Sequence, residues 1–507
     1  MLSKVNSCAV IGLDCEPVEV ELDITAGLGG ITVVGLPDTA VQESKERVRS
    51  AIKNSGYQYP TTRVTINLAP ADIKKEGPSY DLPIAVGILT ASEQVNADLK
   101  DSLFVGELAL NGSLRHTNGM LPVAIYAKSK GYKKLYIPKV NEKEASLVEG
   151  IDVIPVSNLL ELIDHLNKIK IIEPAKIRDV NDFIEKTDWT VDMAFVKGQE
   201  HVKRAIEIAA SGGHNVLMSG PPGTGKTLIA RTVPTILPRM TKEEALEVTK
   251  IYSIAGLLPH DKPLISARPF RTPHHSASAP SLVGGGQFPK PGEISLAHRG
   301  ILFLDELPEF PRTVLENLRQ PLEDGIITIG RAQGTLTFPA KFSLIASMNP
   351  CPCGYSTDPD RDCSCSPTQI IKYQKKISGP LIDRIDLHIE VPRIKFEKLA
   401  EDDKAESSKS IRERVEKARV IQQERFKNKN IISNSEMSSQ DVKELCKISG
   451  PTIDILRTAV SQFQLSARSY YKILKLARTI ADLGEKENIE SAHVAEALQY
   501  RPRNNVV

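Results

Sequence analysis

The strongest local signal in the sequence lies at residues 220–227, which read Gly-Pro-Pro-Gly-Thr-Gly-Lys-Thr. This spacing fits the pattern G-x-x-x-x-G-K-[ST], in which backbone N–H groups bind phosphates, the lysine neutralises them and the last hydroxyl reaches Mg²⁺. The flanking residues predict a strand before the loop and the start of a helix after it. We therefore predict a nucleoside triphosphate site, which the motifs below assign to ATP. Its residues are Gly220, Pro221, Pro222, Gly223, Thr224, Gly225, Lys226 and Thr227.

A second motif lies at residues 300–306, where an apolar run ends in Asp305 and Glu306. An apolar run without alternation is typical of a strand that is buried on both faces of a parallel sheet. Ligands bind at the carboxyl edge of such sheets, so we expect both carboxylates to point toward the phosphates. Asp305 would hold Mg²⁺ together with Thr227, and Glu306 would activate water for attack on the γ-phosphate. The two motifs together predict an ATPase and argue against an ordinary glycine-rich loop.

Length and composition limit what surrounds this site. A chain of 507 residues is too long for one hydrophobic core, so we expect about two to four domains. The 65 basic residues almost balance the 63 acidic ones, and a net charge of +2 gives no overall sign of nucleic-acid binding. Aromatic residues make up only 5% of the chain, which argues against a base-stacking platform. Any nucleic-acid surface must therefore be local, such as a loop or a pore.

The start of the chain lacks the basic flank and long apolar run of an export signal. No apolar run of about 18 residues occurs later in the sequence. The seven cysteines are better explained as reduced thiols or metal ligands than as a disulfide framework. These features predict a cytoplasmic protein with no membrane partner.

The first part of the chain mixes strands and helices. Alternating apolar and polar residues at 18–24 and 63–68 predict half-buried strands. Residues 39–55 predict a helix with one polar face, and residues 82–91 predict an apolar helix. The expected class of this part is α+β.

The rest of the chain divides into a linker and two further domains. A charged stretch broken by Pro174 suits a linker, and residues 196–210 predict a helix that leads into the nucleotide domain. Amphipathic patterns that include 470–483 and 491–499 predict a small helical lid. The predicted boundaries are 1–170 for the α+β domain, 171–192 for the linker, 193–392 for an α/β P-loop domain with a parallel sheet, and 393–507 for the all-α lid.

The α+β domain resembles the proteolytic domain of Lon-type proteases, which implies a fold like domain 2 of ribosomal protein S5. Residues 77–79, Gly-Pro-Ser, match the start of that family's nucleophile motif G-P-S-A-G, and residues 106–112 match its following G-E strand. The family needs a lysine after a downstream glycine pair to deprotonate the serine, and the matching position here holds Leu121. A serine hydroxyl without an adjacent base is a weak nucleophile, so we expect a scaffold or substrate-contact domain rather than a peptidase.

Five strings in the second half of the chain carry a closer resemblance. They are residues 269–275, 281–286, 291–298, 348–354 and 378–388. With the two motifs above, they resemble the AAA+ ATPases, and most closely the magnesium-chelatase-like family of ComM and YifB. The resemblance spans the whole chain, because that family also carries a Lon-like N-terminal domain.

The resemblance implies further site residues and an assembly. Asn349 occupies the position of a polar residue that helps to position the attacking water. Arg384 matches an arginine finger, which contacts the γ-phosphate, and Arg468 matches an arginine of the lid that contacts the same phosphate. The alternative for each arginine is a surface salt bridge. An arginine finger supplied by a neighbouring subunit requires a homo-oligomeric ring, which we expect to be hexameric.

Two segments are candidates for contact with a substrate. Residues 268–298 form a long insertion that is rich in glycine and proline and carries adjacent histidines, for which a loop or pore role fits better than a zinc site. Residues 325–338 read as a hairpin, which in related helicases projects into the ring's channel. Arg331 at its tip could bind the phosphate backbone of DNA without sequence preference. The alternative is a solvated turn.

Four cysteines follow Asn349 closely. Cys351 and Cys353 form one pair, and Cys363 and Cys365 form a second. Four thiolates can close a tetrahedral structural Zn²⁺ site, although a spacing of one residue within each pair departs from the commoner two to four. Zinc ligation and free reduced thiols both remain open.

The leading hypothesis is an ATP- and Mg²⁺-dependent ring motor that acts on single-stranded or branched DNA. DNA as the substrate follows from the resemblance, which implies helicase or branch-migration activity in natural transformation or recombination. A second hypothesis is a motor subunit that drives insertion of Mg²⁺ into a tetrapyrrole, although the Lon-like domain and the cysteines lie outside that pattern. A third is a protein-remodelling or adaptor role, weakened by Leu121 and by the intact ATP motifs.

Overall fold

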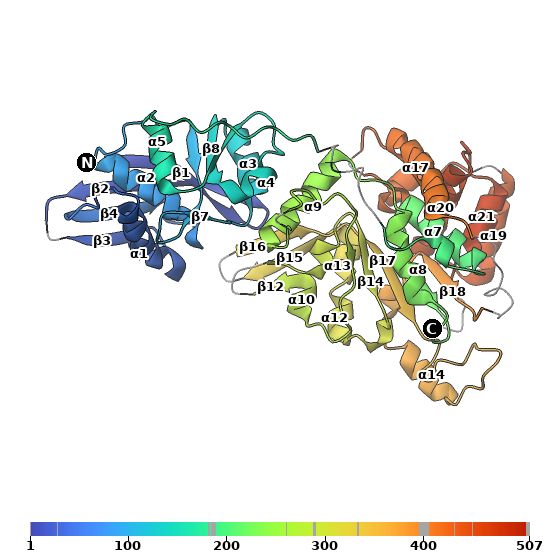
Figure 1. The fold of residues 1–507 in the computed structure, drawn as a ribbon. Coiled ribbons are helices and arrows are strands. Elements are labelled where there is room, and N and C mark those ends of the chain that lie inside the picture. Colours follow the sequence, from blue (N-terminus) through green and yellow to red (C-terminus); the bar gives the residue numbers. More distant parts are fainter. Residues whose placement is uncertain are drawn as a thin grey trace. The chain divides into compact units, whose positions relative to one another are not determined.

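The computed structural model describes residues 2–502 apart from 28, 181–182, 184–188, 260, 287–289, 332–333, 395–404, 430 and 449, and apart from the side chains of 331 and 334. The chain forms two compact units (Figure 1). One unit contains Met1–Lys186 and Ala245–Ser266. The other contains Thr187–Glu244 and Ala267–Val507.

Within the described residues of the first unit, seven strands form one mixed sheet in the order β3-β4-β2-β1-β5-β8-β9. The strands are β1 (Leu2–Ile11), β2 (Asp14–Thr25), β3 (Gly30–Val34), β4 (Arg63–Ala69), β5 (Ser102–Phe104), β8 (Lys134–Pro138) and β9 (Asp152–Val156). β2 pairs antiparallel with both β1 and β4, whereas the other pairs are parallel. Buried and less buried residues alternate along β2 and β4, as the sequence predicts at 18–24 and 63–68.

Helices complete the core of the first unit. They are α1 (Thr39–Asn54), α2 (Asp81–Ala91), α3 (Met120–Ser129), α4 (Glu142–Ala145) and α5 (Leu159–Leu166), and a short hairpin joins β6 (Glu107–Leu108) to β7 (Leu114–Arg115). The helices predicted at 39–55 and 82–91 are confirmed. The side chain of Asp38 caps α1 by accepting from the backbone N–H of Val41 at 2.8 Å. α2 is buried on almost every side, which explains its continuous apolar sequence.

Residues 245–266 pack with the first unit although they lie between the two nucleotide motifs in the sequence. They include most of α9 (Lys242–Ala255). The hydroxyl of Ser253 donates to the buried carboxylate of Glu144, which also accepts from the backbone N–H of Leu121 at 2.8 Å. Residues 245–266 therefore group with the first unit, where Ser253 satisfies a buried carboxylate.

Among the described residues of the second unit, five strands form a wholly parallel sheet in the order β11-β14-β17-β10-β18. The strands are β10 (Val216–Ser219), β11 (Phe270–Arg271), β14 (Ile301–Leu304), β17 (Ser343–Met348) and β18 (Leu387–Glu390). Every residue of β14 is buried, as the unbroken apolar run at 300–304 predicts. The order is not sequential, so loops from distant parts of the sequence meet at one edge of this sheet.

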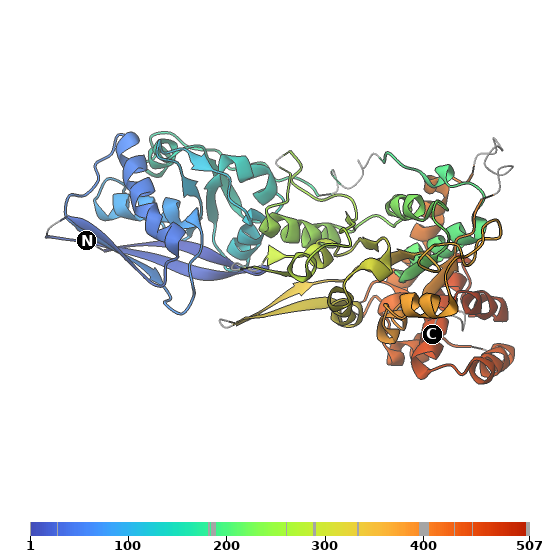
Figure 2. The ribbon, with the colours of Figure 1, turned by 90° about the horizontal axis from the view of Figure 1, so that it is seen from below.

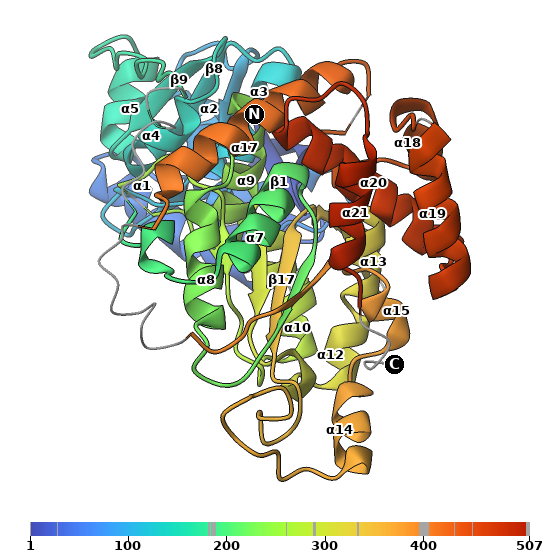
Figure 3. The same cartoon turned by 90° about the vertical axis from the view of Figure 1, so that its right-hand side faces the viewer.

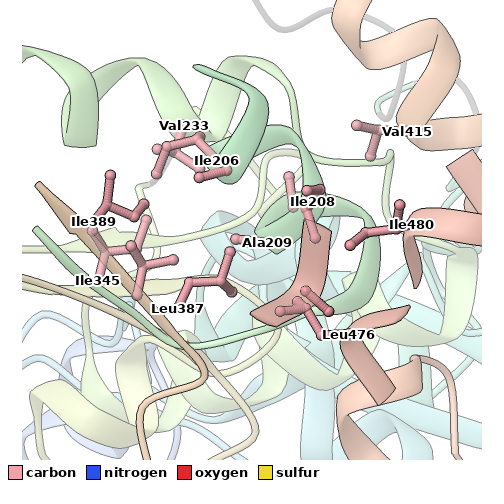
Figure 4. Close-up of a cluster of buried hydrophobic side chains, with 14 of the residues drawn as sticks. Ile206, Ile208, Ala209, Val233, Ile345, Leu387, Ile389, Val415, Leu476 and Ile480 are labelled. Carbon is pink, nitrogen blue, oxygen red and sulfur yellow. The ribbon is translucent and has the colours of Figure 1, made fainter. Parts of the chain in front are cut away.

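One hydrophobic core joins this sheet to the C-terminal helices through α7 (Glu200–Gly212), as Figure 4 shows. The side chains on the sheet side include Ile345, Leu387 and Ile389, and those on the helical side include Val415, Leu476 and Ile480. The prediction placed the start of α7 at residue 196, but the helix begins at Glu200. Gly198 before it has a φ of +67°, a conformation that interrupts a right-handed helix.

The C-terminal region is helical in its described part (Figure 3). Its helices are α17 (Ser408–Arg425), α18 (Ser439–Leu445), α19 (Gly450–Phe463), α20 (Ala467–Leu483) and α21 (Ser491–Gln499). The amphipathic segments predicted at 470–483 and 491–499 lie in α20 and α21. The side chain of Ser466 accepts from the backbone N–H of Ser469 at 3.2 Å and thereby caps α20.

A long two-stranded ribbon formed by β15 (Ile326–Arg331) and β16 (Gly334–Pro339) extends from the second unit (Figure 2). The hairpin predicted at 325–338 is therefore confirmed. The predicted insertion at 268–298 contains β11, α10 (Ala279–Val283), the short strands β12 (Gly284–Gly285) and β13 (Lys290–Pro291), and α11 (Glu293–Leu296). The other α-helices among the described residues are α8 (Lys226–Thr232), α12 (Arg312–Glu316), α13 (Arg319–Asp324), α14 (Pro367–Gln374) and α15 (Gly379–Ile382). None of the described helices is long and apolar enough to cross a membrane.

Candidate nucleotide site

The predicted phosphate-binding loop connects β10 to α8 at the carboxyl edge of the parallel sheet. Gly220 packs so closely against the neighbouring chain that a Cβ there would lie 2.1 Å from the carbonyl oxygen of Val391. Gly223 and Gly225 have φ of +79° and +87°, and a Cβ on either would meet no atom within 4 Å. The first glycine is therefore required by packing, whereas the other two are required by backbone conformation. The space beside Gly223 and Gly225 is open at the start of α8, the kind of place where backbone N–H groups bind phosphates.

Lys226 is the first residue of α8, and its ammonium group is almost buried. Its Nζ donates to the carbonyl oxygens of Gly220 at 2.6 Å and Pro221 at 2.8 Å, and to Oδ1 of Asn349 at 3.3 Å. Burial lowers the pKa of Lys226, and the charges of Asp305 and Glu306 oppose that effect. The structure thus brings Asn349, at the end of β17, to the same group as the loop lysine.

Thr227 and Asp305 meet although they follow different strands. Thr227 Oγ1 donates to Asp305 Oδ2 at 2.7 Å, and the hydroxyl of Ser347 donates to Asp305 Oδ1. A hydroxyl and a carboxylate beside a phosphate loop are the oxygen ligands that Mg²⁺ prefers. Thr227 and Asp305 therefore fit an Mg²⁺ ion, and Ser347, which sequence reasoning missed, fixes the carboxylate.

Glu306 follows Asp305 in a left-handed backbone conformation, with φ +53°. Its backbone N–H donates to Asp305 Oδ1 at 3.1 Å, while its side chain is 56% exposed and free to face a substrate. His275, from the insertion, places Nδ1 3.9 Å from Glu306 Oε2. Non-glycine residues in this conformation concentrate at functional sites. The insertion therefore reaches the carboxylate of Glu306, which its sequence did not indicate.

Gln199 is a second residue that sequence reasoning missed. Its side chain is 1% exposed and donates from Nε2 to the carbonyl oxygens of Thr224 at 3.0 Å and Pro392 at 3.2 Å. A buried amide that bridges the phosphate loop to the chain after β18 restrains both segments. Gln199 lies directly before α7, inside the helix that was predicted at 196–210, so its position gave no signal of this role.

Arg384 and Arg468 meet at a different place. Both guanidinium groups contact the carboxylate of Glu323 on α13, with Arg468 Nη2 3.6 Å from Oε1. The side chain of Arg384 is only 9% exposed, whereas that of Arg468 is 43% exposed. They line a cavity of about 800 Å³, and among the described residues that line it none belongs to the phosphate loop. The structure therefore brings the two arginines together, but not to Lys226.

The four predicted zinc ligands also come together. The ligand atoms of Cys351, Cys353, Cys363 and Cys365 all lie within 4.8 Å of one another. The backbone N–H of Tyr355 is directed at the sulfur of Cys353 and lowers the pKa of that thiol to about 5. The cluster is therefore a possible metal site.

Two other sequence predictions have different outcomes. The side chain of Arg331, the predicted DNA contact, lies outside the described residues, although its backbone ends β15. Ser79 lies in a short 3₁₀ turn at Pro78–Tyr80, before α2. Leu121, at the position of the Lon lysine, is fully buried in α3. The first unit thus holds an apolar side chain where a peptidase of that type needs a base.

Comparison with known proteins relates most of the chain to one family. Residues 192–399 match the family described as magnesium chelatase, subunit ChlI. Residues 20–141 match the family described as subunit ChlI of Mg-chelatase, and residues 405–501 match magnesium chelatase, subunit ChlI C-terminal. These matches cover the phosphate loop, the carboxylate pair and the C-terminal helices.

Individual relatives extend the similarity over the full length. Competence protein ComM of Haemophilus influenzae is 46% identical over 507 residues, which cover 99% of this chain and 97% of the relative. The uncharacterized protein YifB of Escherichia coli is 43% identical over 504 residues, with 99% and 97% coverage. Lon protease 2 of Bacillus subtilis is 28% identical over 179 residues, about a third of each chain, and similarity to Lon proteases lies in the N-terminal part. The chain therefore belongs to the ComM/YifB family of magnesium-chelatase-like AAA+ ATPases.

Proposed function

We propose that this protein hydrolyses ATP at the site formed by the phosphate loop, Asp305 and Glu306. The observation that carries the proposal is the 2.7 Å contact between Thr227 Oγ1 and Asp305 Oδ2, beside the buried ammonium of Lys226. Bound Mg²⁺ would neutralise charge on the β- and γ-phosphates. Thr227 and Asp305 would hold the ion, and Lys226 would exchange its backbone acceptors for phosphate oxygens.

The attacking water would be handled by residues on two neighbouring strands. Glu306 would accept its proton, and Asn349, held by Lys226 at 3.3 Å, would orient it. His275 lies close enough to Glu306 to orient its carboxylate. ATP turnover by the purified chain, measured with and without Mg²⁺, tests this assignment; no turnover above that of a Lys226→Ala variant would refute it.

We further propose that the protein works as a homo-oligomeric ring, with six subunits expected, in which Arg384 and Arg468 serve a neighbouring subunit's ATP. Two arginines on one carboxylate, in a cavity outside the phosphate loop, support this arrangement. In the single chain the carboxylate of Glu323 pairs with both arginines. In the ring, the γ-phosphate of a neighbouring subunit's ATP would replace that carboxylate. A guanidinium fork suits developing charge on a phosphate.

The proposed substrate of the motor is DNA, single-stranded or branched. The name of one full-length relative, a competence protein, supports a role in DNA uptake or recombination, and the hairpin of β15 and β16 offers a local contact surface ending at Arg331. ATP turnover should rise several-fold on addition of single-stranded or branched DNA. Indifference to both DNAs would instead favour a different substrate.

A second candidate is a chelatase-type motor for Mg²⁺ insertion into a tetrapyrrole, favoured by the family matches at residues 20–141, 192–399 and 405–501. A protein-remodelling role is the third. For the first unit, the buried Leu121 supports a scaffold rather than a peptidase. Stimulation of turnover by a tetrapyrrole or by an unfolded protein, but not by DNA, would favour these alternatives.

A further inference from the structure

The segment between β17 and α14 brings two cysteine pairs together without regular secondary structure. The sulfur of Cys351 lies 3.3 Å from that of Cys353 and 3.7 Å from that of Cys363. The sulfurs of Cys353 and Cys363 are 3.6 Å apart. All four cysteines, including Cys365, are free thiols, so no disulfide explains their approach.

These separations fit a single tetrahedral ion. Zn²⁺ binds thiolates at about 2.3 Å, which places the sulfurs of a four-cysteine site about 3.8 Å from one another. All four ligand atoms here lie within 4.8 Å of one another, so they enclose one ion. The backbone N–H of Cys353 also donates to the sulfur of Cys365 at 3.3 Å. This hydrogen bond joins the two cysteine pairs and orients the sulfur of Cys365 toward the place of the ion, as hydrogen bonds to metal ligands commonly do.

The segment has little apolar burial to hold its shape, and its polar contacts are few, such as the ion pair between Asp358 and Arg393 at 3.3 Å. Between residues 351 and 366 only Cys351 and Gly354 are buried, and the remaining residues are mostly polar and exposed. Apolar burial is therefore too small to order a connection of this length. In small segments without a core, a structural metal commonly supplies the missing cross-link.

The segment also contacts the phosphate loop. Gly354 has a φ of +89°, and a Cβ there would lie 2.7 Å from Cδ of Pro222. The same segment begins directly after Asn349, which accepts from Lys226. Figure 3 shows the segment and α14 at the end of the second unit that also carries the start of α8.

We infer that Cys351, Cys353, Cys363 and Cys365 bind one structural Zn²⁺ ion, which holds Asn349 and Pro222 in place for ATP hydrolysis. The site is structural because all four positions of a tetrahedron are filled by protein sulfurs, leaving none for water. The ion would take no part in the chemistry. Its role is to fix the segment that follows β17 and packs against Pro222 of the phosphate loop.

Metal content of the full-length chain tests the inference. Protein purified without added metal, and without a metal-affinity tag, should contain about one zinc ion per chain by elemental analysis. The Cys353→Ser and Cys363→Ser variants should each lose most of it. Cys15→Ser is the matched control, because Cys15 lies in β2, and it should keep a full zinc content.

A measurement on the unmodified chain guards against misfolded variants. Replacement of the native metal by Co²⁺ should give the intense near-ultraviolet absorption of a cobalt–thiolate site, and added Zn²⁺ should remove it. Absence of stoichiometric zinc together with absence of the cobalt absorption would overturn the inference. Stoichiometric iron in place of zinc would overturn it as well. The zinc content and the cobalt absorption are both measured without ATP. Their results are therefore independent of whether the protein hydrolyses ATP.

Discussion

Thr227 Oγ1 donates to Asp305 Oδ2 at 2.7 Å, although 78 residues separate them in the chain. The parallel order of β14, β17 and β10 brings the ends of these strands to one edge, so the loops after β10 and β14 converge there. The same edge carries Asn349 after β17. The fold therefore brings the phosphate loop, the Asp305 carboxylate and the Asn349 amide together, although they lie far apart in the sequence.

Asp305→Asn should abolish most ATP turnover. An amide keeps the shape of the side chain but removes the negative charge that attracts Mg²⁺, and a loss of about 100-fold follows from a few kcal/mol of charge stabilisation. Steady-state turnover measured across a range of Mg²⁺ concentrations checks this. Asp454→Asn, at an exposed position on α19, is the control and should behave like the unmodified chain.

Glu306→Gln should bind ATP normally but turn it over about 10²- to 10⁴-fold more slowly, because the general base is lost. His275→Ala should lower turnover by a smaller factor with little change in ATP affinity, since we propose that His275, 3.9 Å from the Glu306 carboxylate, only orients it. Unchanged turnover in His275→Ala would contradict a specific role for His275.

ATP affinity should weaken with rising pH earlier than an ordinary lysine allows. Burial lowers the pKa of Lys226 in the free protein, and phosphates bind its charged form. As pH rises through the lowered pKa, the ammonium group loses its proton and affinity falls; below that pH, affinity is constant. Titrations with a fluorescent ATP analogue between about pH 7 and 10 measure this. The Lys226→Ala variant should bind ATP weakly, with an affinity that does not change with pH. An affinity of the unmodified chain that is equally independent of pH would contradict this prediction.

Local sequence patterns predicted the helices and strands of this fold better than they predicted which residues contact one another. The sequence spacing alone predicted the loop of Lys226 and the buried strand before Asp305. Backbone conformation and burial on both faces each require a pattern of residues that is visible within a short stretch of sequence. The docking of residues 245–266 on the first unit left no such mark, since it depends on Glu144 more than 100 residues away. His275 and Gln199 were missed for the same reason: their partners are set by the order of strands in the sheet.

Gly354→Ala should lower ATP turnover while leaving the metal content unchanged. The added methyl would press on Pro222 at 2.7 Å, and a φ of +89° disfavours any side chain. Turnover and zinc content measured on the same preparation separate the two effects. Gly450→Ala, where a Cβ meets no atom within 4 Å, is the control. Normal turnover in Gly354→Ala would show that this contact does not matter for the site.

Complementation between two inactive variants tests the central claim that each ATP site is completed by a second subunit. Arg384→Ala should lose about 10³- to 10⁵-fold in turnover as an arginine finger. Glu306→Gln should be comparably inactive on its own. In an equal mixture, a subunit with intact Glu306 can stand next to one with intact Arg384 at about a quarter of the interfaces.

The decisive measurement is therefore the ATP turnover of that mixture after subunit exchange. The account predicts recovery to about a quarter of the unmodified rate, because those interfaces hold both groups. Turnover no higher than the average of the two separate variants would contradict it, since Arg384 would then act within its own subunit or not at all.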